Sequence, residues 1–510
     1  MRRLSATSLS GADYFAPAPL GDIKQATVRG GTVVLVAQAA KFVLAVLTVA
    51  IMARILTPSD YGVFALLMIV VSFIAVLGDF GLSSATIQRT TLTHHEASSL
   101  YWVNIVAGCA LALACVAVSP LVAMIFHQSK VVLALSVMGV SFLVSAVGAQ
   151  HSALLSRVMR FGRVAVCLIG AQVLSSLTGI ALALAGAGYW SLVILQMTYT
   201  LVNSLLLSLL SGWKPARPKR PLLVRELLHF GARVTGFSVA NYVARNMDNI
   251  LIGKVYGLNA LGNYSRAYNM LLAPLEQVMY PIANVMIAAL SRIGIIEREA
   301  FRRTFMSVAT KINLAVMPLV AFAVVDSQSI IRVALGDQWG SAAKIFAVLG
   351  IGGLVEPVIV MTSWLFMSED RTREYLVLGV VGVPVMVCAF FAGLPYGPVG
   401  VAAGYTIVTC AGVVPTFWYT GREGPVSAGD LYRTCVLGAE VAVAVAAGAL
   451  LSREALVTGD ALLSLVASAG VAACAGCVAL AALPAARREV RELRAMALEA
   501  LRGRRRRASV

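Results

Sequence analysis

Apolar residues occur along this chain in long blocks, and polar residues gather in the short segments between them. The blocks are about 20 residues long, which is the length that an α-helix needs to cross the hydrocarbon core of a bilayer. The pattern therefore predicts an all-α, polytopic membrane protein with about 14 transmembrane helices. The predicted spans cover residues 30–53, 61–79, 100–126, 131–156, 164–186, 189–211, 229–253, 266–290, 304–325, 341–367, 375–393, 397–420, 431–451 and 460–483.

The polar segments between the blocks divide the chain into six parts. Residues 1–26 are rich in Ser, Ala, Pro and Gly and are predicted to be a disordered cytoplasmic tail without a cleavable signal peptide. Six spans follow in residues 27–211, and the basic linker 212–228 connects them to six more spans in residues 229–420. Residues 421–483 hold two additional spans, and residues 484–510 are predicted to be a basic amphipathic tail on the inner leaflet.

The composition agrees with a membrane protein, since 59% of the residues are hydrophobic and 13% are charged. Thirty Lys and Arg residues fall in segments that lie inside if the N-terminus is cytoplasmic, against five in the outer segments. This bias predicts that both termini are cytoplasmic. The net charge of +17 is explained by basic loops that face an anionic membrane, so no nucleic-acid partner is expected.

One predicted span, which contains residue 238, carries many polar side chains. At about 100° per residue, six of them fall within about a third of the helix circumference. Such a stripe cannot face lipid, so it must face a water-filled cavity or partner helices. Arg245 and Asp248 are three positions apart on this face and can pair. The stripe consists of Ser238, Asn241, Tyr242, Arg245, Asp248 and Asn249.

The same segment has a weaker internal repeat 200 residues earlier in the chain, and the two copies align without gaps. The first predicted span therefore has polar residues at three of the six positions that are polar in the later span. Two matched polar helices, one in each half, indicate a duplicated bundle with a site at its centre. The matched pairs are Gln38/Ser238, Lys41/Asn241, Thr48/Asp248, Arg54/Lys254, Gly62/Gly262 and Phe64/Tyr264.

Cationic side chains inside the spans are the candidates for binding substrate, because each costs about 2.5–3.5 kcal/mol at the centre of a membrane. The alternative for each is a structural ion pair, or a snorkelling position near a helix end, as for Arg233. Lys and Arg bind phosphate through charge-assisted hydrogen bonds, so a cationic cavity suits a diphosphate. We assign substrate binding to Lys41, Arg245, Lys311 and Arg233, with the polar side chains Gln38, Ser238, Asn241 and Asn249 beside them.

Acidic side chains inside the spans are the candidates for ion coupling and gating, with H⁺ or Na⁺ as the coupled ion. They are Asp248, Glu276 and Glu356. Glu356 precedes Pro357, so it lies at a predicted kink where backbone groups are freed, and capping that kink is its alternative role. No catalytic residue, metal site or other cofactor is expected, and the sequence contains no Walker A motif for ATP.

The chain resembles a known family in three runs of residues. They are A-R-I-L-T-P-S-D-Y-G-V-F-A-L at 53–66, G-D-F-G-L-S-S-A-T-I-Q-R at 78–89, and N-M-D-N-I-L-I-G-K-V-Y-G-L-N-A-L-G-N-Y-S-R-A-Y-N-M at 246–270. They resemble the polysaccharide transporter branch of the multidrug/oligosaccharidyl-lipid/polysaccharide exporter superfamily. Within it, the chain is similar over residues 25–480 to Wzx-type flippases such as the colanic-acid and teichuronic-acid exporters.

The resemblance implies two pseudo-symmetric six-helix lobes around a V-shaped cavity, plus two C-terminal helices. It implies that a polyprenyl-diphosphate-linked oligosaccharide crosses the bacterial inner membrane by alternating access, for lipopolysaccharide or exopolysaccharide biosynthesis. In this family cationic residues of the cavity are thought to bind the substrate. The resemblance implies this role for Lys41 and Arg245, and with weaker support for Lys311 and Arg233. The implied partners are this substrate and membrane lipids, with a polysaccharide polymerase and chain-length machinery as further candidates.

Two other functions compete with this expectation. A drug/cation antiporter of the same superfamily normally has an acidic cavity and twelve spans, whereas the polar positions here are net cationic. An integral-membrane polysaccharide polymerase or glycosyltransferase normally has a sizeable outer loop. The longest predicted outer loop here, residues 326–340, is short, so the sequence favours the flippase and predicts that the protein is not an enzyme.

Overall fold

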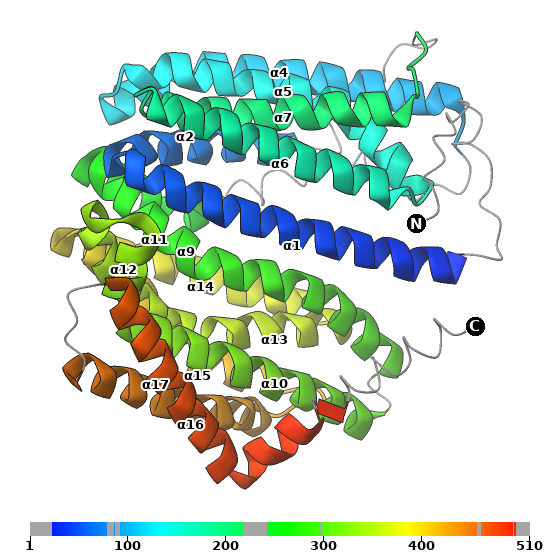
Figure 1. Cartoon of the computed structure of the whole chain (residues 1–510). Coiled ribbons are helices and arrows are strands. Elements are labelled where there is room, and N and C mark those ends of the chain that lie inside the picture. The colour runs from blue at the N-terminus through cyan, green and yellow to red at the C-terminus, as the bar shows by residue number, and fades with distance from the viewer. Residues whose placement is uncertain are drawn as a thin grey trace. The chain divides into compact units, whose positions relative to one another are not determined.

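The computed structural model describes residues 23–78, 86, 92–217, 242–294, 297–455, 461–492 and 494–495. Within these ranges every regular element is a helix, which confirms the all-α fold (Figure 1). The α-helices are α1 (Ile23–Ile55), α2 (Pro58–Leu77), α4 (His94–Phe126), α5 (Lys130–Arg157), α6 (Phe161–Leu184), α7 (Trp190–Ser211), α9 (Met247–Ile293), α10 (Arg298–Val325), α11 (Ser327–Leu335), α12 (Gly340–Gly353), α13 (Glu356–Ser368), α14 (Thr372–Gly393), α15 (Gly397–Thr420), α16 (Ala428–Ala455) and α17 (Ala461–Ala482).

Twelve helical stretches of the described residues are long and apolar enough to cross a membrane, which confirms a polytopic membrane fold. The stretch Thr372–Thr420 contains both α14 and α15, so it covers two of the predicted spans. The span predicted at 229–253 lies partly outside the described residues. The span predicted at 341–367 consists of two helices, α12 and α13, because the chain breaks just before Pro357.

Two helices begin where the local sequence supplies a capping box. At the start of α2, the backbone N–H of Asp60 donates to Thr57 Oγ1 at 3.2 Å, and the backbone N–H of Thr57 donates to Asp60 Oδ2 at 3.0 Å. Thr93 and Glu96 make the same pair of bonds at the start of α4. Each box satisfies N–H groups that the first helical turn leaves unpaired, so short-range sequence determines these helix starts.

Two stretches that we predicted to be irregular are helical. α1 begins at Ile23, inside the tail predicted for residues 1–26, because residues 23–26 contain neither Gly nor Pro and continue directly into the first span. The predicted outer loop 326–340 contains α11 and a short 3₁₀-helix, Asp337–Trp339. Residues 1–22 and 496–510 lie outside the described part of the chain.

Residues Met1–Gly262 form the first of two compact units. In it α4 packs along α5, and α6 packs along α7 and α1. Figure 1 shows α4, α5 and α7 side by side. The first residues of the predicted linker are held on this bundle by Trp213, which is 3% exposed and whose ring centroid lies 5.3 Å from that of His151 and 6.0 Å from that of Tyr101.

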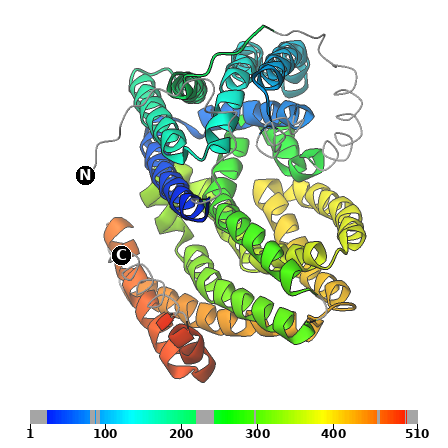
Figure 2. The ribbon, with the colours of Figure 1, turned by 90° about the vertical axis from the view of Figure 1, so that its right-hand side faces the viewer.

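Residues Asn263–Val510 form the second compact unit. In it α10 packs along α16, as Figure 2 shows, and α14 packs along α15. Two hydrogen bonds of 2.8 and 2.6 Å from Arg302 to the carboxylate of Asp430 join α10 to α16. The predicted additional spans, α16 and α17, pack within this unit. Its core contains the fully buried Phe301, Phe305, Trp364 and Phe417.

The two compact units meet within α9, a helix that kinks at Gly257, where φ is 78°. The predicted division between the halves lies earlier, at the linker 212–228, of which residues 212–217 are described. The units therefore divide the chain later than that linker, because residues 258–262 pack closely against α2.

Candidate functional site

Lys41 lies on α1 in the first unit, and its side chain is half-buried. The ammonium group donates to the phenol oxygen of Tyr199 on α7 at 2.8 Å and lies 4.5 Å from the centroid of that ring. A phenol oxygen and a ring face stabilise a cation without neutralising it. Among the described residues no carboxylate lies within ion-pair distance of Lys41, so its positive charge remains available to an anion.

Thr48 lies two turns further along α1 and continues the polar stripe into the first unit. Its hydroxyl is buried and donates to Ser176 Oγ on α6 at 2.7 Å. The side-chain amide of Gln172, one turn before Ser176, also donates to Ser176 Oγ, at 3.2 Å. Gln38, by contrast, is exposed. Two members of the predicted stripe on α1 therefore bond to two different helices, α7 and α6, whereas the third is exposed.

Arg245 and Asp248 lie on either side of a turn at Asn246, just before and just after the start of α9. Arg245 is exposed, whereas Asp248 is 2% exposed. The carboxylate of Asp248 accepts hydrogen bonds from the backbone N–H and the side-chain amide of Asn249, at 2.7 and 3.0 Å. In the described part of the chain no ion pair joins Arg245 to Asp248, because the turn places the two side chains in different environments.

Three other predicted site residues, Arg233, Ser238 and Asn241, lie outside the described residues. Tyr242, next to them, donates its hydroxyl proton to the carbonyl oxygen of Ile69 on α2 at 2.8 Å. This bond joins the residues just before α9 to α2 within the first unit.

Lys311 lies on α10 in the second unit, and its side chain is 10% exposed. Its ammonium group lies 2.8 Å from Glu489 Oε2 and 3.2 Å from Glu492 Oε2, and it donates to Ser307 Oγ at 2.6 Å. The hydrogen bond and charge of Lys311 lower the pKa of Glu492 below its usual range. Two carboxylates thus surround the cation that we predicted to bind an anion, and both come from the helical segment that follows α17.

Glu356 lies at the break between α12 and α13, as its position before Pro357 predicted. Tyr405 on α15 donates its phenol proton to Glu356 Oε2 at 2.9 Å. Pro357 has no N–H group, so the carbonyl of Gly353 lacks its helical donor at this break. Glu276 is half-buried on α9, between Pro274 and Pro281. A single carboxyl group at a helix break can hold or release a proton or bind a small cation.

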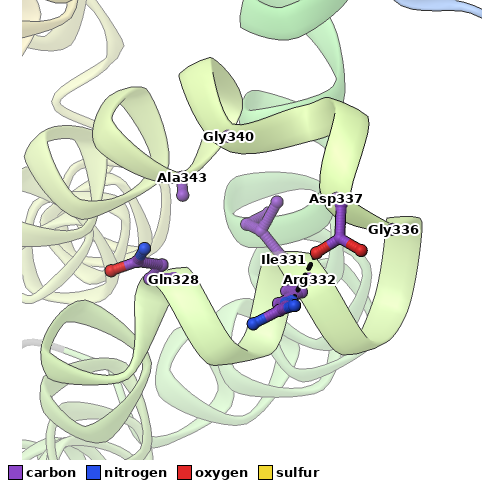
Figure 3. A pocket seen from close by; sticks show the side chains of 7 residues that line it. All are labelled: Gln328, Ile331, Arg332, Gly336, Asp337, Gly340 and Ala343. Atoms are coloured by element: carbon purple, nitrogen blue, oxygen red, sulfur yellow. Dashed lines mark ion pairs between the residues drawn. The ribbon is translucent and has the colours of Figure 1, made fainter. Parts of the chain in front are cut away.

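A small pocket of about 210 Å³ lies between α11 and the start of α12 (Figure 3). Gln328, Arg332 and Asp337 line it with polar groups, and Arg332 and Asp337 form an ion pair. Both members of the pair are largely exposed, at 53% and 78%, so the pair contributes about 0–1 kcal/mol. None of these residues belongs to the predicted site.

The described residues contain no group of three or more His, Cys, Asp or Glu side chains that could hold a metal ion. The structure brings together Lys41 with Tyr199, Thr48 with Ser176, and Glu356 with Tyr405. The partners could not be predicted from the sequence, because a single polar residue in an apolar helix does not show which helix it faces. The only feature of the sequence that could have identified these partners is that each is a polar residue within a predicted span.

Comparison with known proteins finds a family and several relatives that are named for polysaccharide biosynthesis. A family model described as "Polysaccharide biosynthesis protein" matches residues 51–344. The lipopolysaccharide biosynthesis protein WzxC of Escherichia coli (strain K12) is 23% identical over 403 residues, which cover 78% of this chain and 81% of that protein. The succinoglycan biosynthesis transport protein ExoT of Rhizobium meliloti (strain 1021) is 26% identical over 319 residues, 62% of this chain and 64% of that protein.

Among solved structures, the inward closed conformation of the lipid II flippase MurJ has a similar fold. The TM-score is 0.66 at 14% sequence identity, and the match covers 88% of this chain and 98% of the flippase. At this level of identity the likeness concerns the fold alone.

Proposed function

The chain belongs to the polysaccharide biosynthesis protein family, and from this premise we propose that it is a flippase for a polyprenyl-diphosphate-linked oligosaccharide. It moves the lipid-linked sugar from the inner to the outer leaflet by alternating access, for lipopolysaccharide or exopolysaccharide biosynthesis. Two relatives support this proposal, because one is named for lipopolysaccharide biosynthesis and the other for succinoglycan transport. The proposal therefore makes the protein a transporter and gives it no catalytic step.

The observation that carries the proposal is the half-buried ammonium group of Lys41 within a membrane-spanning helix. Its partner in the structure is the neutral phenol of Tyr199. A cation without a negative partner inside a membrane-spanning helix is unfavourable unless an anion or water reaches it. A diphosphate that must pass the hydrocarbon core supplies such an anion and accepts charge-assisted hydrogen bonds from Lys.

We propose Glu356 as the group that couples transport to a H⁺ or Na⁺ gradient, with Asp248 and Glu276 as further candidates. Glu356 is supported by its place at a helix break and by its bond to Tyr405. The protein lies in the bacterial inner membrane in this proposal, and a polysaccharide polymerase and chain-length machinery receive the translocated units.

Replacing Lys41 with Met tests the substrate role. A lost charge-assisted hydrogen bond contributes about 1.5–3 kcal/mol, so binding of the diphosphate should weaken roughly tenfold to a hundredfold. We expect surface polysaccharide to fall, and polyprenyl-diphosphate-linked repeat units to accumulate on the inner leaflet. Tyr199→Phe, which keeps the cation, should have a smaller effect of the same kind.

The matched control is Lys130→Met, because Lys130 is an exposed lysine at the start of α5. That variant should export normally. Normal polysaccharide output from Lys41→Met at an unchanged protein level would contradict the role of Lys41. Loss of output without accumulation of lipid-linked units would contradict the flippase function itself.

A further inference from the structure

A close backbone crossing joins α2 to the part of α9 that follows its kink. Gly62 on α2 and Gly262 on α9 are both buried. A methyl group on Gly62 would overlap the carbonyl oxygen of Leu258, and one on Gly262 would overlap the carbonyl oxygen of Pro58. The backbone nitrogen of Gly62 lies 3.0 Å from the Cβ position of Gly262. The two helices therefore touch backbone to backbone, with no side chain between them.

The crossing obeys the register of the internal repeat. A shift of 200 residues exchanges Pro58 with Leu258 and Gly62 with Gly262. The contact of Gly262 with Pro58 is therefore the repeat-related equivalent of the contact of Gly62 with Leu258. The structure contains both contacts. The bends that precede the crossing also correspond, since α2 begins after Thr57 and α9 kinks at Gly257. The contact is therefore the place where equivalent segments of the two repeats meet.

Both segments lie at the predicted outer ends of their spans, where the chain passes between spans one and two and between spans seven and eight. Alternating access requires that the outer side is closed while the inner side is open. A backbone contact between small residues excludes water and substrate, and it separates without any repacking of side chains. Side chains that interdigitate would instead have to change rotamers at each cycle.

We infer that the crossing of Gly62 and Gly262 is the outer seal of the transport pathway, and that it opens once in each cycle. This inference rests on the proposed function. It assigns closure of the outer side to the two glycines and to the carbonyl groups of Pro58 and Leu258. The opposite possibility is a static contact or a pivot, which would persist throughout the cycle.

A disulfide across the crossing separates these possibilities. Ser59 and Asn259 are the equivalent exposed residues next to it, and both are replaced by Cys in a variant that lacks the eight native cysteines. We expect the oxidised protein to lose export and the reduced protein to regain it. Undiminished export by fully cross-linked protein would overturn the seal.

Glycine-to-alanine variants test the same contact without a cross-link. Gly62→Ala and Gly262→Ala place a methyl group against backbone, which no rotamer change relieves. We expect several-fold faster labelling of a single cysteine at position 59 by an impermeant maleimide added outside, together with reduced export. Gly379→Ala and Gly470→Ala are the matched controls, because nothing lies within 4 Å of a methyl group at either helical position.

The seal and the flippase function fail in different ways. If the seal is wrong, labelling in the glycine variants equals that in the controls, while Lys41→Met still lowers export. If the flippase function is wrong, lipid-linked units do not accumulate in any variant, while labelling and cross-linking still report whether the crossing opens. If a glycine-to-alanine variant is absent from the membrane, the cross-link between positions 59 and 259 in protein that keeps Gly62 and Gly262 tests the seal instead.

Discussion

Lys41 and Lys311 show how tertiary partners decide what a buried cation can do. Both lysines lie inside predicted spans, and the sequence offers the same argument for each. In the structure Lys311 contacts two carboxylates, whereas Lys41 contacts a phenol. A paired cation has little remaining attraction for a diphosphate, because its partners already satisfy its charge. The structure therefore favours Lys41 over Lys311 as an anion-binding residue.

Replacing Arg245 with Ala should abolish export, because it removes a cation that the sequence assigns to substrate binding. The variant should remain in the membrane, because an exposed guanidinium contributes little to folding. Asp248→Ala should instead lower stability, since it removes a buried acceptor of two hydrogen bonds from Asn249. No ion pair joins Arg245 to Asp248 in the described part of the chain, so the effects should add in the double variant. Polysaccharide output and membrane protein level are the measurements.

Restored export in the double variant would show that the two residues act as a structural pair. Arg245→Lys separates charge from geometry at the same position. It should retain part of the activity if charge alone matters, and lose it if a bidentate guanidinium is required.

Short connecting segments, and not only the long helices, hold the second unit together at the scale of elements. Arg371, in the connection between α13 and α14, bonds to Glu369 at 2.8 Å and to Glu374 at 2.6 Å. It also donates to the carbonyl oxygens of Thr420, the last residue of α15, and Glu423, in the connection between α15 and α16. One side chain thus fastens two predicted inner loops to each other.

Replacing Arg371 with Ala should destabilise the protein by about 3–5 kcal/mol, because it leaves the buried Glu369 carboxylate without its partner. Burial already raises the pKa of Glu369, and the loss of Arg371 should raise it further. A carboxyl group whose pKa is higher in the folded state favours folding at low pH and loses that contribution as pH rises through the folded pKa. The melting temperature of the variant should therefore be less reduced near pH 5 than near pH 8. Arg371→Ala with Glu369→Gln should recover part of the loss, and an equal loss at both pH values would contradict this account.

The segment after α17, which the sequence predicts to lie on the inner leaflet, is attached to α10. Ala486 is fully buried, and Glu489 and Glu492 contact Lys311. The lowered pKa of Glu492 means that its contribution is present above the ordinary glutamate pKa and is lost as pH falls through the lowered value. A spin label at position 485 should therefore become more mobile in acid. Lys311→Met should make the label mobile at neutral pH, and a label that stays immobile in that variant would show that lipid alone holds the segment.

At the scale of the whole molecule, the chain forms two compact units of helices, and twelve stretches of the described residues are able to cross a membrane. The fold class and the polytopic character agree with the sequence prediction, and the family match agrees with the predicted role in polysaccharide biosynthesis. The predicted orientation remains a prediction, because neither the helices nor their packing distinguishes inside from outside.

A reporter fused after Val510 tests the orientation. The bias of thirty inner to five outer basic residues predicts that the C-terminus is cytoplasmic. A fluorescent protein fused there should be fluorescent, and a phosphatase that is active only outside should be inactive. An active phosphatase would reverse the orientation, and with it the assignment of the crossing of Gly62 and Gly262 to the outer side.

The sequence by itself determined the positions of the spans and several of their ends. Span length follows from the thickness of the hydrocarbon core, and helix starts follow from local groups such as Thr57 with Asp60 and Thr93 with Glu96. The kink near Glu356 was predictable as well, because Pro357 lacks an N–H group. The repeat was visible because its two copies share a register of 200 residues.

Only the tertiary structure decided which polar groups meet. Lys41 and Tyr199 are 158 positions apart, and the Lys311 cation is paired by a segment beyond the last span. The pattern along one helix gives the direction of a side chain around that helix, but not the identity of the helix that it faces. That identity depends on how all the spans pack, which is why the contact of Gly62 with Leu258 and its repeat-related copy could be recognised only in three dimensions.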